Sequence, residues 1–150
     1  MAGLFFTLAP GAVAIASATA KTALQIVAAS NHRTLLHAIS LGGNGVTAAD
    51  PPAKVALLIQ TTAGTMSSLT PAKENAGDDE TIQTTAQHTA TVEPTDSTEK
   101  WSDYLHMQTA TGVIKFVPPL VIPGGTRLAL KVTPGTMTGC NVIPWARCEE

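Results

Sequence analysis

The chain has 150 residues, a length that fits one domain able to bury a sizeable core. Hydrophobic residues make up 44% of it, and the mean hydropathy of +0.17 excludes a disordered polyelectrolyte. The net charge of −2 and the pI of about 6.0 exclude a strongly basic nucleic-acid-binding protein, so we expect no nucleic-acid partner.

The first twenty residues are apolar and resemble a secretory signal in outline. They lack a positively charged start, and Pro10 and Gly11 interrupt the apolar run. No run in the chain reaches the roughly 18 consecutive apolar residues of a membrane span. We therefore expect a soluble protein that is made in the cytoplasm and has no membrane partner.

Charge is scarce and unevenly placed. Charged residues make up 13% of the chain, whereas it holds 23 Ala and 22 Thr, a neutral exterior that suits packing in an assembly and suits some monomers. The stretch from Lys73 to Asp103 has a net charge of −6, while residues 1–49 contain only Lys21 and Arg33. We expect the acidic stretch to be a solvated side, with a cation site as the alternative, and the N-terminal third to form core and contact surface.

In chain order, short alternating segments bounded by Gly, Pro, Asn and Ser predict strands. A turn at 30–33 joins the first two strands as a hairpin, and the Gly-rich residues 42–45 end the second. Residues 64–77 and 93–102 are expected as polar loops. The expected strands cover 22–29, 34–41, 54–62, 81–92, 104–109, 113–117, 126–133 and 141–145.

About eight strands and no convincing long helix predict an all-β fold, an antiparallel β-sandwich that is jelly-roll-like. Residues 12–29 are ambiguous, because their alanines favour a helix while their β-branched residues weaken it. We divide the chain into a short apolar N-terminal arm at 1–20 and a β-sandwich domain at 21–150.

Catalytic and metal-binding patterns are weak. The four histidines have neither helical spacing nor a Cys-x-x-Cys partner. His88 and His106 fall in strands expected to be neighbours and could meet Asp79 or Glu80, although exposed strand histidines are the simpler interpretation. There is no Gly-x-Ser-x-Gly or phosphate-binding loop. We expect no catalytic residue, no cofactor and no metal.

The two cysteines, Cys140 and Cys148, are eight residues apart. In one continuous strand they would lie about 26 Å from each other, too far for a disulfide. A disulfide would need the chain to turn back at Pro144. Two free thiols are therefore the favoured interpretation.

Two segments remain as candidate partner contacts. Leu4, Phe5, Phe6 and Leu8 form an uncharged apolar cluster near the N-terminus, which either enters the core of the chain or docks on a partner. Near the C-terminus, Trp145 and Arg147 are residue types enriched at interface hot spots, although core packing is the more common role of a Trp.

Several phrases of the chain, in this order, resemble small virion proteins of tailed bacteriophages. They are the segments Lys21–Arg33, Gln60–Thr65 and Ile122–Leu130 and the terminal W-x-x-x-E-E. The resemblance covers most of residues 21–150 and includes no catalytic motif. It implies a β-sandwich head protein of the decoration or cement type, which sits on the capsid lattice and is often a trimer. Cys140, Pro144 and Cys148 depart from a simple final strand and leave its pairing open.

We therefore expect a non-enzymatic phage head protein on the capsid surface of the virion, with the major capsid protein and its own copies as partners. It would stabilise the lattice by bridging subunits. The alternative is a tail- or fibre-associated module that binds a receptor or a carbohydrate through the loops at 63–80 and 93–103. A third possibility is a metal enzyme of the cupin type, which needs histidines and a carboxylate gathered between the sheets.

Overall fold

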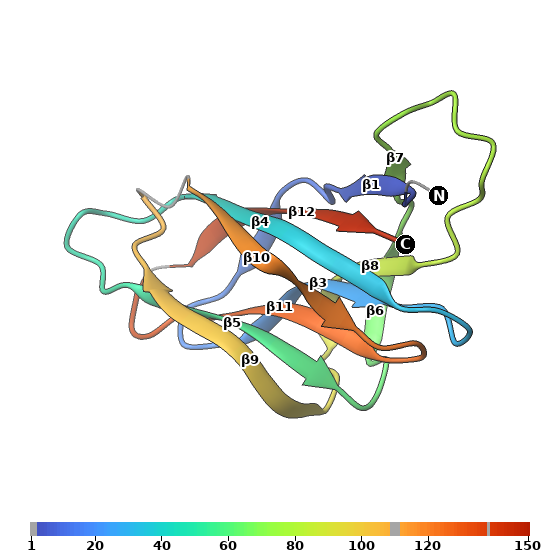
Figure 1. The fold of residues 1–150 in the computed structure, drawn as a ribbon. Helices are drawn as coiled ribbons and strands as arrows, with labels where there is room; N and C mark the ends of the chain where they lie inside the picture. The colour runs from blue at the N-terminus through green and yellow to red at the C-terminus, as the bar shows by residue number, and fades with distance from the viewer. Residues whose placement is uncertain (1–2, 109–111, 138) are drawn as a thin grey trace.

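The computed structural model describes residues 3–108, 112–137 and 139–150. Its described residues form twelve strands and no helix, and all the strand pairs are antiparallel. The strands make two six-stranded sheets, here called sheet A and sheet B, that lie face to face (Figure 1). The all-β prediction is confirmed, and the architecture is consistent with a β-sandwich.

Sheet A has the order β10-β4-β12-β1-β7, and β2 also pairs with β12. Its strands are β1 (Phe5–Leu8), β2 (Val13–Ile15), β4 (Thr34–Asn44), β7 (Ala72–Lys73), β10 (Val113–Ile122) and β12 (Cys140–Glu149). Sheet B has the order β6-β8-β3-β11-β5-β9. Its strands are β3 (Lys21–Val27), β5 (Ala53–Gln60), β6 (Thr65–Leu69), β8 (Thr85–Val92), β9 (Asp96–Leu105) and β11 (Arg127–Thr133).

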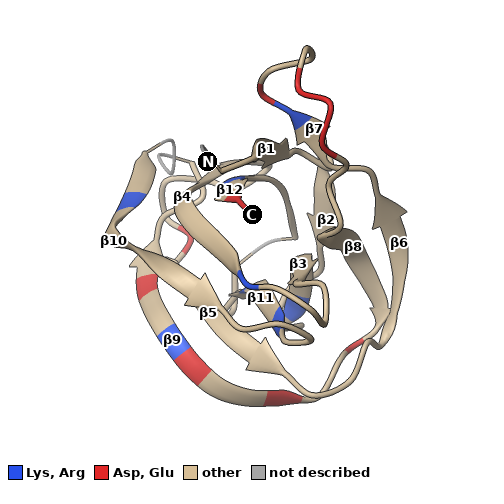
Figure 2. Cartoon of the chain, turned by 45° about the vertical axis from the view of Figure 1, so that its right-hand side comes forward, with Lys and Arg blue, Asp and Glu red and all other residues tan. Residues whose placement is uncertain are grey.

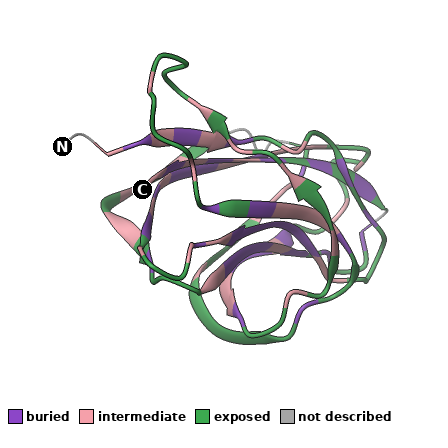
Figure 3. Ribbon diagram, turned by 90° about the vertical axis from the view of Figure 1, so that its right-hand side faces the viewer, coloured by how far each residue is buried: buried purple, intermediate pink, exposed green. Residues whose placement is uncertain are grey.

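The core fills the space between the two sheets. Along β12 every second residue is buried, and Figure 3 shows this alternation of buried and outward positions in the ribbon. Leu24 and Ile26 of β3 face Leu36 and Ile39 of β4 within one cluster of buried residues. This burial of apolar side chains from both sheets is the main stabilising term of the fold.

The hairpin expected at residues 22–41 is wrong. β3 belongs to sheet B and β4 to sheet A, so the turn at 30–33 carries the chain from one sheet to the other. Both strands present an apolar face, and these faces pack against each other across the core instead of lying in one sheet.

The Gly-rich segment 42–45 was expected to end a strand, yet β4 continues to Asn44 and pairs with β12. A Cβ atom on Gly43 would lie 2.7 Å from the carbonyl oxygen of Met107. Glycine is needed at this position because another part of the backbone approaches closely, not because the chain turns.

Both expected polar loops contain strands. Residues 64–77 hold β6 and β7, and residues 93–102 form most of β9. All three strands lie at the edges of their sheets, where a polar side chain stays in water. Polar composition therefore misidentified edge strands as loops.

The final strand, whose pairing the sequence left open, runs unbroken through Pro144. On one side β12 pairs with β4 along its length, and on the other it pairs with β2 at 140–142 and with β1 at 146–149. Pro144 lies between those last two stretches, where no strand occupies that side. A missing N–H is tolerated there.

Candidate contact surface

The apolar N-terminal cluster is divided between the two faces of sheet A. Leu4, Phe6 and Leu8 are buried, and Phe6 and Leu8 belong to the main core. Of the two alternatives for these three residues, entry into the core is the one observed. Phe5 points to the opposite face, because it lies between Leu4 and Phe6 in an extended segment.

Phe5 and Arg147 meet on the outer face of sheet A. The guanidinium carbon of Arg147 lies 4.6 Å from the centre of the Phe5 ring. The same guanidinium donates two hydrogen bonds to Glu74, at 2.6 and 2.8 Å, and these bonds hold the pKa of Glu74 below its usual value. This cluster joins β1 and β12 to the segment that follows β7.

Trp145 also lies on this outer face and not in the core. Its neighbours along β12, Pro144 and Ala146, are the buried ones. Trp145 pairs across the sheet with Ser40 of β4, and Ser40 pairs in turn with Val113 of β10. The large side chains of β12 and β10 thus flank a small one on β4.

Four of the six large hydrophobic residues that are strongly exposed lie on β10 and β12. Val113, Val121 and Ile143 are 54%, 47% and 50% exposed, and Val117 is 91% exposed at a break in the β10 register. By the register, Val113 and Val121 share the outer face with Leu35 and Trp145. We name Leu35, Val113, Val121, Ile143 and Trp145 the apolar face of sheet A.

Charged residues gather elsewhere. Figure 2 shows acidic residues in the loop after β7 and along β9, whereas β10 carries a single charged residue, Lys115. At the far end of the outer face, Glu149 and His37 form a contact of 2.7 Å. The apolar face therefore combines exposed hydrophobic side chains with little charge, which is the composition of an interface core.

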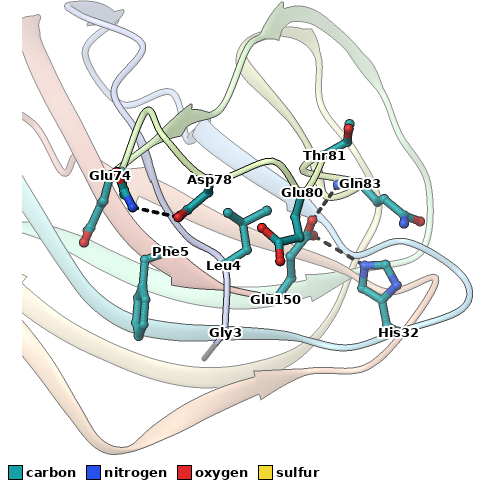
Figure 4. Close-up of a pocket in the computed structure, with 11 residues that line it drawn as sticks. Gly3, Leu4, Phe5, His32, Glu74, Asp78, Glu80, Thr81, Gln83 and Glu150 are labelled. Atoms are coloured by element: carbon teal, nitrogen blue, oxygen red, sulfur yellow. Dashed lines mark hydrogen bonds and ion pairs between the residues drawn. The ribbon is translucent and has the colours of Figure 1, made fainter. Parts of the chain in front are cut away.

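A second feature is a pocket of about 780 Å³ beneath the loop that joins β7 to β8 (Figure 4). Leu4 and Phe5 supply apolar surface, and the loop adds side chains such as Asn75, Asp78 and Glu80. Asn75 donates a hydrogen bond of 2.7 Å to Asp78. The pocket offers hydrogen-bonding groups beside an apolar floor, but none of its groups forms a nucleophile and base pair within the described residues.

The histidine and cysteine predictions have separate outcomes. His88 lies on β8 and His106 follows β9, and three strands of sheet B separate β8 from β9, so the expected neighbourhood is wrong. In the part of the chain that the structure describes, no group of three or more His, Cys, Asp or Glu side chains could hold a metal ion. Cys140 and Cys148 are free thiols on the buried side of β12, which confirms the prediction.

The sequence reasoning missed the apolar residues of β10 and β12. One signal was available, because Ile143 alternates with the buried Val142 and Pro144 and so had to face outward. For β10, the alternation in VIKFV places apolar residues on both faces, and only the pairing with β4 identifies the outer one.

Searches against protein-family models, curated proteins and solved structures find no match to the chain. Within the described ranges there is no helix long and apolar enough to cross a membrane.

Proposed function

We propose that this protein is a non-enzymatic decoration or cement protein of a phage capsid, built on a jelly-roll-like sandwich. Its partner would be the major capsid protein on the outer surface of the head. The observation that carries the proposal is the apolar face of sheet A, where Val113, Val121 and Ile143 are about half exposed on a rigid sheet with little charge. The resemblance of the sequence to phage virion proteins supports the same function.

The mechanism is mechanical. Docking of the apolar face on the capsid removes hydrophobic surface from water, which contributes about 25 cal/mol per Å² buried. A copy that spans two capsid subunits must lose this burial before the subunits separate. The acidic loop after β7 and the charged strand β9 remain in solvent in this arrangement, because their net negative charge is costly to bury.

The test is binding to heads that lack the protein. Wild-type protein is expected to bind in stoichiometric amount and to raise the temperature at which the heads open. Ile143→Lys should lose this binding, because it places a charge in the centre of the apolar face. Tyr104→Lys is the matched control, since Tyr104 is 68% exposed on β9 of sheet B.

Both variants should unfold at the wild-type temperature, because both positions are exposed. Head binding by Ile143→Lys at the wild-type level would contradict the proposed docking face. Wild-type protein that binds no heads would contradict the proposed function itself.

The pocket supports a second candidate, a tail- or fibre-associated module that binds a carbohydrate or a receptor. Apolar surface from Leu4 and Phe5 beside Asn75 and Glu80 suits a ligand with hydroxyl groups and an apolar ring face. A glycan array would test it. Binding that is lost in Asn75→Ala and Glu80→Gln but kept in Ile143→Lys, with no binding to heads, would favour this function over the first.

A further inference from the structure

Among the described residues, each sheet ends in two edge strands, which are β10 and β7 in sheet A and β6 and β9 in sheet B. An edge strand presents unpaired backbone N–H and C=O groups, so it can add a strand from another molecule. Folded proteins block this with charge, proline, bulges or very short strands. The four edges of this protein differ in these features.

Three of the edges are blocked. β9 carries charged side chains along its length, namely Asp96, Glu99, Lys100 and Asp103. β10 loses its register with β4 between Lys115 and Leu120, and Pro118 and Pro119 lie within that break. β7 has two residues, one of them Lys73, and leads into the acidic loop.

The fourth edge, β6, has none of these features. Its five residues, TMSSL, include no charged residue and no proline. No charged residue occurs anywhere between Lys54 and Lys73. Thr65, Ser67 and Ser68 are exposed, and β6 pairs only with β8, so its other side is open to solvent. In Figure 2, β6 lies at the rim of the molecule with no charged residue on it.

We infer that β6 is a self-association edge, through which two copies of this chain pair antiparallel about a twofold axis. The occupant is a second copy because an uncharged strand is complementary to itself. A twofold axis places each side chain near its own equivalent, which for a charged strand would bring like charges together. The pairing joins the sheet B of each copy into one continuous sheet. It stands independently of the proposed head-binding function.

The contact is short, so the dimer is expected to be weak. Five residues supply few backbone hydrogen bonds, and we expect a dissociation constant on the order of 100 µM. The twofold arrangement also closes at two copies, because each β6 edge satisfies the other. This differs from the trimer implied by the resemblance to phage proteins.

Sedimentation velocity from about 10 µM to 1 mM protein tests the proposal. Wild-type protein should convert from monomer to dimer across this range. Ser68→Lys should weaken the association by about tenfold or more, because two lysines then meet across the axis. Ser68→Asp should do the same. An equimolar mixture of the two variants should recover dimers, since opposite charges then meet. A variant that had merely misfolded would not recover.

Ser102→Lys is the matched control, a serine on the outer face of the same sheet but on the charged edge β9. It should associate as the wild type does. Wild-type protein that stays monomeric at 1 mM or forms a trimer would overturn the inference. So would Ser68→Lys protein that dimerises like the wild type, because the contact would then lie elsewhere.

Discussion

Glu150 holds Thr84 by two hydrogen bonds, as its carboxylate accepts one from the main-chain N–H at 2.8 Å and one from the hydroxyl at 2.6 Å. The N–H of Gln83 donates a third, at 2.6 Å. Burial alone would raise the pKa of this carboxyl, but these bonds outweigh it and the pKa is lowered. The last residue of the chain thereby anchors the segment that leads into β8.

We predict that Glu150→Gln lowers the free energy of unfolding by about 1–3 kcal/mol at pH 7, because a neutral amide accepts these bonds less well. A lowered pKa in the folded state stabilises the protein above the pKa of the unfolded state, and this contribution is lost as the pH falls through the folded value. The difference between the two proteins should therefore shrink from pH 7 to pH 3.

Urea unfolding at several pH values measures this difference. Glu80→Gln, at an exposed position in the same loop, is the control and should change stability by less than about 0.5 kcal/mol. An equal loss from Glu150→Gln at pH 7 and pH 3 would contradict the assigned role of the carboxylate.

The neighbours Phe5 and Phe6 are expected to differ sharply in their contribution to stability. Phe6 is fully buried, so Phe6→Ala should cost about 3–5 kcal/mol through lost burial and the cavity left behind. Phe5 contacts Arg147 and His37 on the outer face, and Phe5→Ala should cost about 1 kcal/mol. Chemical denaturation of both variants tests the division, and similar losses would argue against the placement of β1.

A buried polar network links Gln25 and Gln60. The side-chain amide of Gln25 donates to Gln60 at 2.7 Å, and that of Gln60 donates to Thr22 at 3.0 Å and to Asp96 at 2.9 Å. Replacing either glutamine by leucine leaves buried polar groups unpaired and should cost about 1–3 kcal/mol. The double variant should cost less than the sum of the two single ones, because it removes both partners together. Additive losses in a double-mutant cycle would show that the two side chains are not coupled.

The two thiols should be unreactive in the folded protein. Cys140 and Cys148 are buried, and burial raises the pKa of both thiols, so little reactive thiolate forms. A thiol reagent at pH 8 should label neither cysteine in buffer and both in denaturant. Fast labelling of Cys148 without denaturant would show that β12 is less securely paired than the structure indicates.

The parts of the fold that could be predicted from the sequence are those in which one face of a strand is apolar. β3, β5 and β11 were expected close to their observed bounds because Leu24, Leu57 and Leu130 lie within clear alternating patterns. β6 and β9 were expected as loops because edge strands keep polar side chains in water, and composition alone does not distinguish the two. The assignment of β3 and β4 to different sheets depends on long-range packing, which no local pattern reports.

The candidate surface could be predicted only in part. Trp145 and Arg147 were expected at a contact and do lie on the outer face, whereas Phe6 and Leu8 are in the core. Val113 and Val121 were missed, because their outward direction depends on their pairing with β4 across a break in register. A sequence pattern identifies two faces of a strand but not which one meets the core.

The short connection between β6 and β7 has a mechanical consequence. Only Thr70 and Pro71 separate a strand of sheet B from a strand of sheet A, whereas residues 106–112 separate β9 from β10 on the opposite side. The two layers therefore cannot shear past each other at the β6 end without unpairing one of these strands. Any molecule that grips β6 pulls on both layers at once, so a load applied there is shared by the whole sandwich.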